Sequence, residues 1–432
     1  MKDLHDIAQR SRLSFYQVSV SDVEVRNQAL LRLADLLVQE KEAVFEVNRA
    51  DLTAAEKEQL APPLLHRLTF GEEKLQQMVL GLKALAAMPD PLNRTLLSTE
   101  ITAGLNLYKV TSPIGVVGVI FESRPDALIQ IASLCIKSGN AVLLKGGREA
   151  LGTNQALAGL VRRALADAGL PADTAQLLET REDVAEMLRE DTLIDLIIPR
   201  GSNSFVRYIM DHSRIPVLGH SDGICHVYID ESANPDTALK VAVDSKVQNV
   251  SVCNAMETLL VHEGIAPQVL PPLFAALSER HVEVRGDAAV CGIIPCRPAS
   301  EADWATEYLD YILSVKVVSS LQEAIDHINR YGSHHTDCIV TENREHASVF
   351  LKQVDSAGVY WNVSTRFADG FVYGLGAEVG IATGKLHARG PMGLEGLTTY
   401  KYKLIGSGQT MDEMKKGLRS YTHQPLNENC PL

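Results

Sequence analysis

The chain has 432 residues, 46% of them hydrophobic, and a formal net charge of −13. This length and composition predict two or three domains with sizeable cores. The acidic balance argues against an electrostatic nucleic-acid binder, and no apolar run is long enough to span a membrane. The seven cysteines are scattered and odd in number, so we expect reduced thiols in a cytoplasmic protein, without a disulfide framework or a metal site.

The opening of the chain changes character once. Residues 1 to about 93 show the apolar spacing of amphipathic helices, most clearly over residues 29–37. A polar β-hairpin then follows, with its turn at Ala103-Gly104. Because this polar hairpin stands between helical and α/β segments, we expect it to pair outside its own domain, for example at a subunit interface.

Strands and helices alternate in the next segment. The pattern predicts strands at 116–121, 141–145, 175–178 and 193–198, with helices at 125–137, 154–168 and 182–189 between them. Such repetition predicts a parallel sheet with helices on both faces.

The carboxyl ends of these strands carry polar loops at 122–124, 145–147 and 200–202, which together form a plausible dinucleotide site. No G-x-G-x-x-G is present, so a standard Rossmann phosphate grip is not supported. Lys145 leaves a buried strand into two glycines, where it could reach a ribose or its 2′-phosphate. A solvated lysine at a strand end is the alternative interpretation.

A second α/β unit contains Cys253. A helix with Asn234 as its N-cap and Pro235 as its first residue is followed by the polar loop 249–257, and then by a buried strand over 258–261. A cysteine in such a loop is held rigidly and stays reachable, which predicts a nucleophile, although a small buried turn residue is the alternative. Alternation continues to about residue 368. The remaining chain is dense in glycine interleaved with apolar residues, which predicts tight turns.

Three stretches carry a family resemblance: SVCNAMET at 251–258, GLGAEVGI at 374–381 and KLHARGPMGL at 385–394. They resemble the gamma-glutamyl phosphate reductases of the aldehyde dehydrogenase superfamily, and the likeness covers essentially the whole chain. It implies an α/β, aldehyde dehydrogenase-like fold with two Rossmann-like parallel-sheet domains plus a small β oligomerisation element. The implied parts are a cofactor-binding domain (1–94 and 111–226), a catalytic domain (227–369), a return segment to the cofactor domain (370–391) and the oligomerisation element (95–110 and 392–432).

The resemblance implies NADPH-dependent reduction of L-glutamyl 5-phosphate to L-glutamate 5-semialdehyde, with release of phosphate, in L-proline biosynthesis. The Cys253 thiolate would attack the acyl phosphate, and the resulting thioester would accept a hydride. The N–H of Cys253 is the expected oxyanion donor. The implied partners are this small-molecule substrate, a possible glutamate 5-kinase and further copies of the chain in a dimer or tetramer.

The resemblance also suggests substrate and proton-transfer residues. Hydrolytic aldehyde dehydrogenases use a glutamate in a short glycine motif to activate water, whereas the matching stretch 219–223 carries His220. We expect His220 to contact phosphate or donate a proton, with a backbone-bonded turn residue as the alternative. Arg124 and Arg366 are expected to bind substrate anions, with surface ion pairing as the alternative. Ser221 and Asn254 are also expected to bind substrate.

On the cofactor side, Lys145, Ser202 and Glu307 match positions that contact the adenosine ribose, the pyrophosphate and the nicotinamide ribose of the dinucleotide. Lysine at the first position tolerates the 2′-phosphate of NADPH. Two rival functions stay open: a hydrolytic aldehyde dehydrogenase that acts on another small aldehyde, and a catalytically silent scaffold of the same fold.

Overall fold

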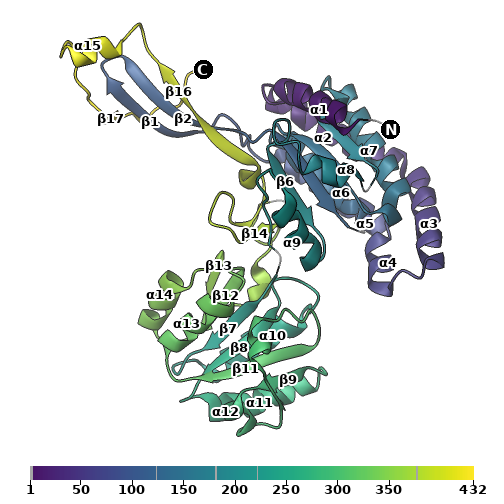
Figure 1. Ribbon diagram of the computed structural model, residues 1–432, viewed down its shortest axis with the longest axis vertical. Helices are drawn as coiled ribbons and strands as arrows, with labels where there is room; N and C mark the ends of the chain where they lie inside the picture. Colours follow the sequence, from purple (N-terminus) through teal and green to yellow (C-terminus); the bar gives the residue numbers. More distant parts are fainter. Residues whose placement is uncertain (1–2, 123, 181, 221, 376–377) are drawn as a thin grey trace.

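The computed structural model describes residues 3–122, 124–180, 182–220, 222–375 and 378–432. Two α/β lobes lie one above the other, and a long β arm projects from the upper lobe (Figure 1). None of the helices in the described ranges is long and apolar enough to cross a membrane.

The first lobe is built on a parallel sheet of order β5-β4-β3-β6. Among the described residues, five helices precede it, which confirms the predicted helical opening, and four more follow its strands. Its strands are β3 (Val116–Phe121), β4 (Ala141–Lys145), β5 (Ala175–Leu178) and β6 (Leu196–Arg200). Its helices are α1 (Leu4–Val18), α2 (Val23–Gln39), α3 (Lys41–Lys57), α4 (Pro62–Leu68), α5 (Glu72–Ala87), α6 (Pro125–Lys137), α7 (Leu151–Asp167), α8 (Glu182–Met187) and α9 (Asn203–His212).

Both faces of this sheet are covered. Val117 and Val119 of β3 belong to the core beneath α2, α5, α6 and α7, whereas Val116 and Ile120 pack with α1 and α8 on the other side. Strands buried on both faces read as continuous apolar runs, which is why the sequence pattern located them. The predicted parallel sheet is therefore confirmed.

One predicted strand is displaced. β6 begins at Leu196 and not at Leu193, because the chain is still turning after α8, with Ile194 N–H donating to Glu190 O at 2.9 Å. Asp195 N–H then donates to Val116 O at 2.9 Å, which fixes where β6 joins β3. The apolar residues Leu193 and Ile194 fill the turn, so hydrophobicity alone misplaced the strand boundary.

The second lobe contains a seven-stranded parallel sheet of order β10-β9-β11-β8-β7-β12-β13. Its strands are β7 (Cys225–Ile229), β8 (Met256–His262), β9 (Glu283–Gly286), β10 (Arg297–Pro298), β11 (Ile312–Val318), β12 (Thr336–Val340) and β13 (Gly358–Trp361). Its helices are α10 (Pro235–Val247), α11 (Ala266–Ser278), α12 (Ala288–Cys291), α13 (Leu321–Tyr331) and α14 (Arg344–Gln353). Short 3-10 turns in the chain lie at Arg148–Ala150, Ala172–Thr174, Glu301–Ala305, Thr365–Phe367 and Glu395–Leu397.

The arm is an antiparallel sheet of order β16-β2-β1-β17. The hairpin β1 (Thr95–Thr102) and β2 (Leu105–Pro113) turns at Gly104, whose φ is +75°. The hairpin pairs with segments distant in sequence, since β16 (Thr398–Ile405) lies along β2 and β17 (Gln424–Pro425) along β1. Both strands belong to the same predicted element as the hairpin, so the expected pairing outside its own domain stays a prediction.

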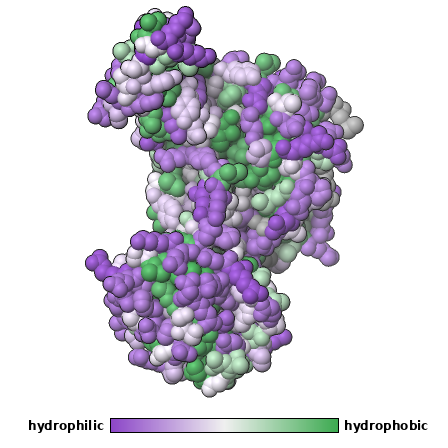
Figure 2. All heavy atoms as spheres, turned by 60° about the vertical axis from the view of Figure 1, so that its left-hand side comes forward, coloured by the Kyte–Doolittle hydropathy of each residue, from purple (hydrophilic) through white to green (hydrophobic). Residues whose placement is uncertain are grey.

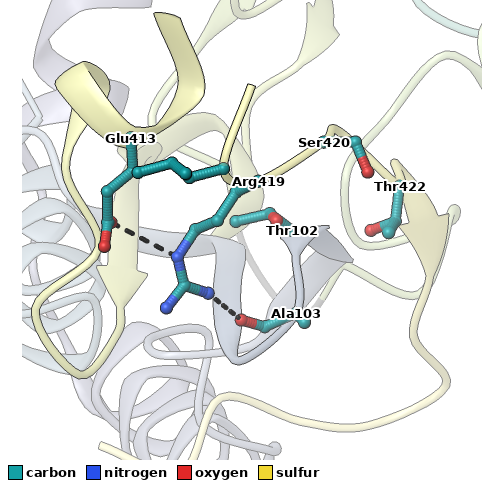
Figure 3. A pocket seen from close by; sticks show the side chains of 7 residues that line it. Thr102, Ala103, Glu413, Arg419, Ser420 and Thr422 are labelled. Carbon is teal, nitrogen blue, oxygen red and sulfur yellow. Dashed lines mark hydrogen bonds and ion pairs between the residues drawn. The ribbon is translucent and has the colours of Figure 1, made fainter. Parts of the chain in front are cut away.

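The tip of the arm is tied together by Arg419. Its Nε donates to Glu413 Oε2 at 3.3 Å and its guanidinium donates to Ala103 O at 3.3 Å (Figure 3). This contact fastens the chain after α15 (Met411–Lys415) to the β1–β2 turn. The surface depression at this tip is lined by residues of the arm alone.

After the second lobe the chain returns to the first. Val379 and Met392 of this return segment are buried in the core of the first lobe. Val379 N–H donates to Met392 O, and Met392 N–H donates to Gly380 O, so the two ends of the segment are bonded to each other. The short strands β14 (Ile381–Ala382) and β15 (Gly390–Pro391) pair between them. Residues near 378–382 are thereby held where the two lobes meet.

A buried ion pair fixes the loop that carries Cys253. Lys246, at the end of α10, and Glu257, at the start of β8, are both fully buried, with Nζ and Oε2 2.6 Å apart. Burial raises the pKa of Glu257 to about 7 and lowers the pKa of Lys246. The other carboxylate oxygen of Glu257 accepts the N–H of Leu309 at 3.1 Å, where the backbone has a left-handed φ of +52°. One pair therefore holds both the Cys253 loop and the turn after Glu307.

Breaking this pair should damage stability and the site together. Lys246→Met leaves Glu257 buried without its counter-charge, so we expect a loss of about 3–5 kcal/mol in the free energy of unfolding, measured by urea denaturation. The double variant Lys246→Met/Glu257→Leu should recover most of that stability, because an apolar pair carries no desolvation cost. Activity should stay low in the double variant, since Leu309 N–H has lost its acceptor. Equal stability of the wild type and Lys246→Met would contradict this account.

Candidate active site

Cys253 lies in the loop between α10 and β8, with its thiol partly exposed. The backbone of Gly223 lies directly against the backbone of Cys253, because a Cβ added at Gly223 would lie 2.2 Å from Cys253 O. The buried Cys225 thiol also donates to Cys253 O at 3.3 Å. The loop thus has a fixed backbone and a reachable sulfur, which is the arrangement that a nucleophilic thiol requires.

His220 lies beside this thiol. Its Nδ1 lies 2.8 Å from Ile381 O, and burial lowers the pKa of the ring. A neutral ring bonded in this way carries its proton on Nδ1, so Nε2 is the nitrogen left as an acceptor. The backbone bond foreseen in the alternative interpretation of His220 is present, and it orients the ring.

A second histidine completes the cluster. His335, just before β12, is 1% exposed and its ring meets that of His220 edge-on at 4.9 Å. One ring nitrogen of each histidine and Cys253 Sγ all lie within 4.8 Å of one another. Sequence reasoning missed His335, because no motif marks it and only the folding of β12 beside β7 brings it to Cys253.

Positive charge surrounds the thiol. Arg200, at the end of β6, and Arg366, in the second lobe, both interact with the charge that Cys253 carries when ionised. Burial lowers the pKa of both guanidinium groups, and Glu378 partly offsets this effect at Arg200. Arg366 is oriented by its Nε, which donates to Gln248 Oε1 at 2.8 Å.

Arg124, the third arginine near the site, is exposed at the start of α6 and lies within electrostatic range of Arg200. Arg124 and Arg366 are the arginines that the sequence predicts for the site, whereas Arg200 stands out in the sequence only as part of a strand-end loop. The signal that could have found Arg200 is a charged residue directly at the carboxyl end of a buried parallel strand.

Asn254 and Ser221 are the two remaining residues that the sequence predicts to bind substrate. Asn254 is 5% exposed, and its side-chain amide donates to Ala368 O at 2.9 Å. Its Oδ1 is buried without a partner among the residues that the structure describes. Ser221 lies outside the described residues.

Two of the predicted cofactor residues, Lys145 and Ser202, lie at the carboxyl edge of the first sheet, and the third, Glu307, belongs to the second lobe. Lys145 ends β4 and is 8% exposed, with Nζ 2.5 Å from Gly146 O. Ser202 caps α9, and its N–H donates to Glu122 Oε2 at 3.1 Å. Glu307 of the second lobe accepts a hydrogen bond from Asn203 of α9. The carboxylate therefore reaches the first lobe at the start of that helix.

Comparison with known proteins identifies the family of the chain. Residues 1–310 match the model of the aldehyde dehydrogenase family. The gamma-glutamyl phosphate reductase of Acetivibrio thermocellus is 56% identical over 416 residues, which cover 96% of both chains. That of Pelotomaculum thermopropionicum is 56% identical over 427 residues, covering 99% of this chain and 98% of the relative.

Solved structures give the same result. The crystal structure of gamma-glutamyl phosphate reductase from Thermotoga maritima superposes with a TM-score of 0.93 at 37% identity, covering 95% of this chain and all of that one. An acetylating aldehyde dehydrogenase from Geobacillus thermoglucosidasius shares the fold, with a TM-score of 0.65 at 16% identity. The chain belongs to the aldehyde dehydrogenase family and, within it, to the gamma-glutamyl phosphate reductases.

Proposed function

We propose that the protein reduces L-glutamyl 5-phosphate to L-glutamate 5-semialdehyde with NADPH, releasing phosphate, through a thioester on Cys253 in L-proline biosynthesis. The observation that carries this proposal is the reachable Cys253 thiol within 4.8 Å of a histidine nitrogen. Arg200 and Arg366 add positive charge around it. Relatives that are 56% identical along nearly the whole chain bear the name of this activity.

Formation of the thioester assigns a role to each neighbour of the thiol. His220 Nε2 takes the thiol proton while Nδ1 stays bonded to Ile381 O. The sulfur forms a bond to the δ-carbonyl carbon of the substrate. The C–O bond to phosphate then breaks, and phosphate leaves with the electron pair, stabilised by the guanidinium groups of Arg200 and Arg366.

The tetrahedral intermediate carries an oxyanion that needs donors. Cys253 N–H is one, because within the described ranges it makes no hydrogen bond. Asn254 follows directly in the chain with its side chain tied to Ala368 O, which keeps this part of the loop in place. After reduction, the C–S bond breaks, the aldehyde leaves and the thiolate regains its proton from His220.

The carboxyl edge of the first sheet fits a nicotinamide dinucleotide. A Cβ at Gly201 would come within 2.8 Å of Glu122 Oε2, so the glycine lets this carboxylate lie close to the backbone of the β6–α9 loop. Lys145 would face the adenosine ribose and its 2′-phosphate, Ser202 the pyrophosphate and Glu307 the nicotinamide ribose. Bound NADPH would supply the hydride that reduces the thioester. Burial raises the pKa of Glu307, and the bond from Asn203 opposes that shift and orients the carboxylate.

Water must be kept from the thioester, since hydrolysis would return glutamate. The glycine stretch that matches the water-activating motif presents His220, whose ring is fixed by Ile381 O. A histidine in place of the water-activating glutamate favours transfer of the acyl group to phosphate, or its reduction by hydride, over transfer to water.

We infer that the protein works as a homo-oligomer held by its arm. Leu97, Tyr402 and Leu404 are 45%, 59% and 58% exposed on neighbouring strands of the arm, and a group of exposed apolar side chains marks an interaction surface. Figure 2 shows a further apolar area on the first lobe next to the arm. A second copy that packs against these surfaces would bury both.

The reverse reaction tests the proposed chemistry. With glutamate 5-semialdehyde and NADP+, NADPH formation followed by absorbance should depend strictly on added phosphate. Cys253→Ala should lower the rate by about 10⁴-fold or more, because no thioester can form. Cys296→Ser, a change at a cysteine of the second lobe remote from the loop, should leave it unchanged. NADPH formation without phosphate would support the hydrolytic dehydrogenase, and an unreactive wild type would support the silent scaffold.

His220 should matter for proton transfer and not for folding. His220→Gln removes the acceptor nitrogen, so we expect kcat to fall about 10²- to 10⁴-fold. Alkylation of Cys253 by iodoacetamide, read by peptide mass spectrometry, should slow in parallel. The matched control is His212→Gln on α9, whose Nδ1 is also bonded to a backbone carbonyl, that of Tyr208. A variant at His220 with the rate of the control would refute the assignment.

The arm should determine the mass of the particle in solution. Leu404→Glu places a charge on the proposed interface, so light scattering should report a smaller assembly than for the wild type. Leu80→Glu is the control, since Leu80 is 68% exposed and belongs to α5 of the first lobe and not to the strands of the arm. A monomeric wild type, or equal masses for the wild type and both variants, would contradict the proposed interface.

A further inference from the structure

The Cys253 cluster also has the chemistry of a metal site. The thiol of Cys253 and the imidazoles of His220 and His335 come from three different segments, yet their donor atoms lie within 4.8 Å of one another. Thiolate and imidazole are the ligands that Zn²⁺ prefers in proteins, at distances of about 2.0–2.3 Å. Donor atoms around one tetrahedral Zn²⁺ stand about 3–4 Å apart, so the three donors are already close to the separations that a single ion requires.

Both imidazoles are already oriented as metal ligands are. A ligating histidine commonly bonds its second ring nitrogen to a carbonyl or another polar group, which fixes the ring and its tautomer. His220 Nδ1 has Ile381 O at 2.8 Å, and His335 Nδ1 has Thr336 Oγ1 at 3.0 Å. The Nε2 atom of each ring is therefore the nitrogen that is left to bind a metal. His335 Nε2 is buried and has no hydrogen-bond partner within the described part of the chain, although an unpaired buried nitrogen is costly.

We propose that His220, Cys253 and His335 bind a single Zn²⁺ ion, which reversibly inhibits the protein. Binding replaces the thiol proton, which passes to the solvent, and leaves a fourth coordination position for water or an anion. No electron transfer is involved. A thiolate held by the metal cannot attack a carbonyl carbon, and His220 Nε2 can no longer take a proton. The inhibition rests on the proposed function, whereas binding of the metal does not.

A competing soft site exists in the second lobe. Cys291 and Cys296 lie with their Sγ atoms 3.1 Å apart, and both are partly exposed. Among the described residues, no group of three or more potential ligands forms around this pair. Two thiols alone offer half of a tetrahedral set, so the pair serves as the internal control for unspecific thiol binding.

The test is a titration of the chelator-treated full-length protein with Co²⁺, a spectroscopic substitute for Zn²⁺. We expect one equivalent to produce a thiolate-to-cobalt charge-transfer band together with visible bands of tetrahedral Co²⁺, and Zn²⁺ should remove both. Cys253→Ala should abolish the charge-transfer band. His335→Gln and His220→Gln should each weaken binding at least about tenfold. Cys296→Ser should bind like the wild type.

Inhibition is measured separately, by the rate of the phosphate-dependent reverse reaction in increasing Zn²⁺. Chelator should restore the rate, and bound Zn²⁺ should protect Cys253 from iodoacetamide in a peptide map even without substrate. Circular dichroism establishes that each variant is folded, and if His335→Gln is not, His220→Gln decides. A thiolate-to-cobalt charge-transfer band that survives in Cys253→Ala, or that disappears in Cys296→Ser alone, would overturn the proposal. Absence of any thiolate band with the wild type would overturn it as well.

Discussion

The buried pair of Lys246 and Glu257 is the constraint on which the site depends. It spans the loop that presents Cys253, and through Leu309 N–H it also holds the turn after Glu307. Burial of both charges is costly, as the raised pKa of Glu257 shows. The pair is therefore better explained by its geometry than by the stability it adds, because it fixes the nucleophile and the proposed cofactor contact in one framework.

The site is shared between parts of the chain that are distant in sequence. Cys253 and His335 belong to the second lobe, and Arg200 ends a strand of the first. His220 lies in the stretch of chain between α9 of the first lobe and β7 of the second. The return segment is buried in the core of the first lobe and supplies the carbonyl of Ile381 that orients His220. A shift between the lobes would separate these groups, so the packing of the return segment bears directly on the chemistry.

Local patterns in the sequence were sufficient for part of this picture. The strands Ala141–Lys145 and Ile312–Val318 were located correctly, because continuous apolar runs between turn residues are characteristic of buried parallel strands. Cys253 stood out through its loop and the family resemblance. His335 did not, since its approach to Cys253 depends on the register of β12 beside β7, in which Cys338 pairs with Val227. Likewise, the approach of Glu378 to Arg200 arises only when the return segment folds back.

The most direct test of the central claim, that Cys253 is acylated during turnover, is mass spectrometry of the intact protein. Incubated with glutamate 5-semialdehyde and NADP+ but without phosphate, the protein should accumulate one glutamyl group as a thioester. Digestion should locate this group on the peptide that contains Cys253, and added phosphate should remove it. A glutamyl group on another residue, or rapid turnover with phosphate but no adduct in its absence, would contradict the account.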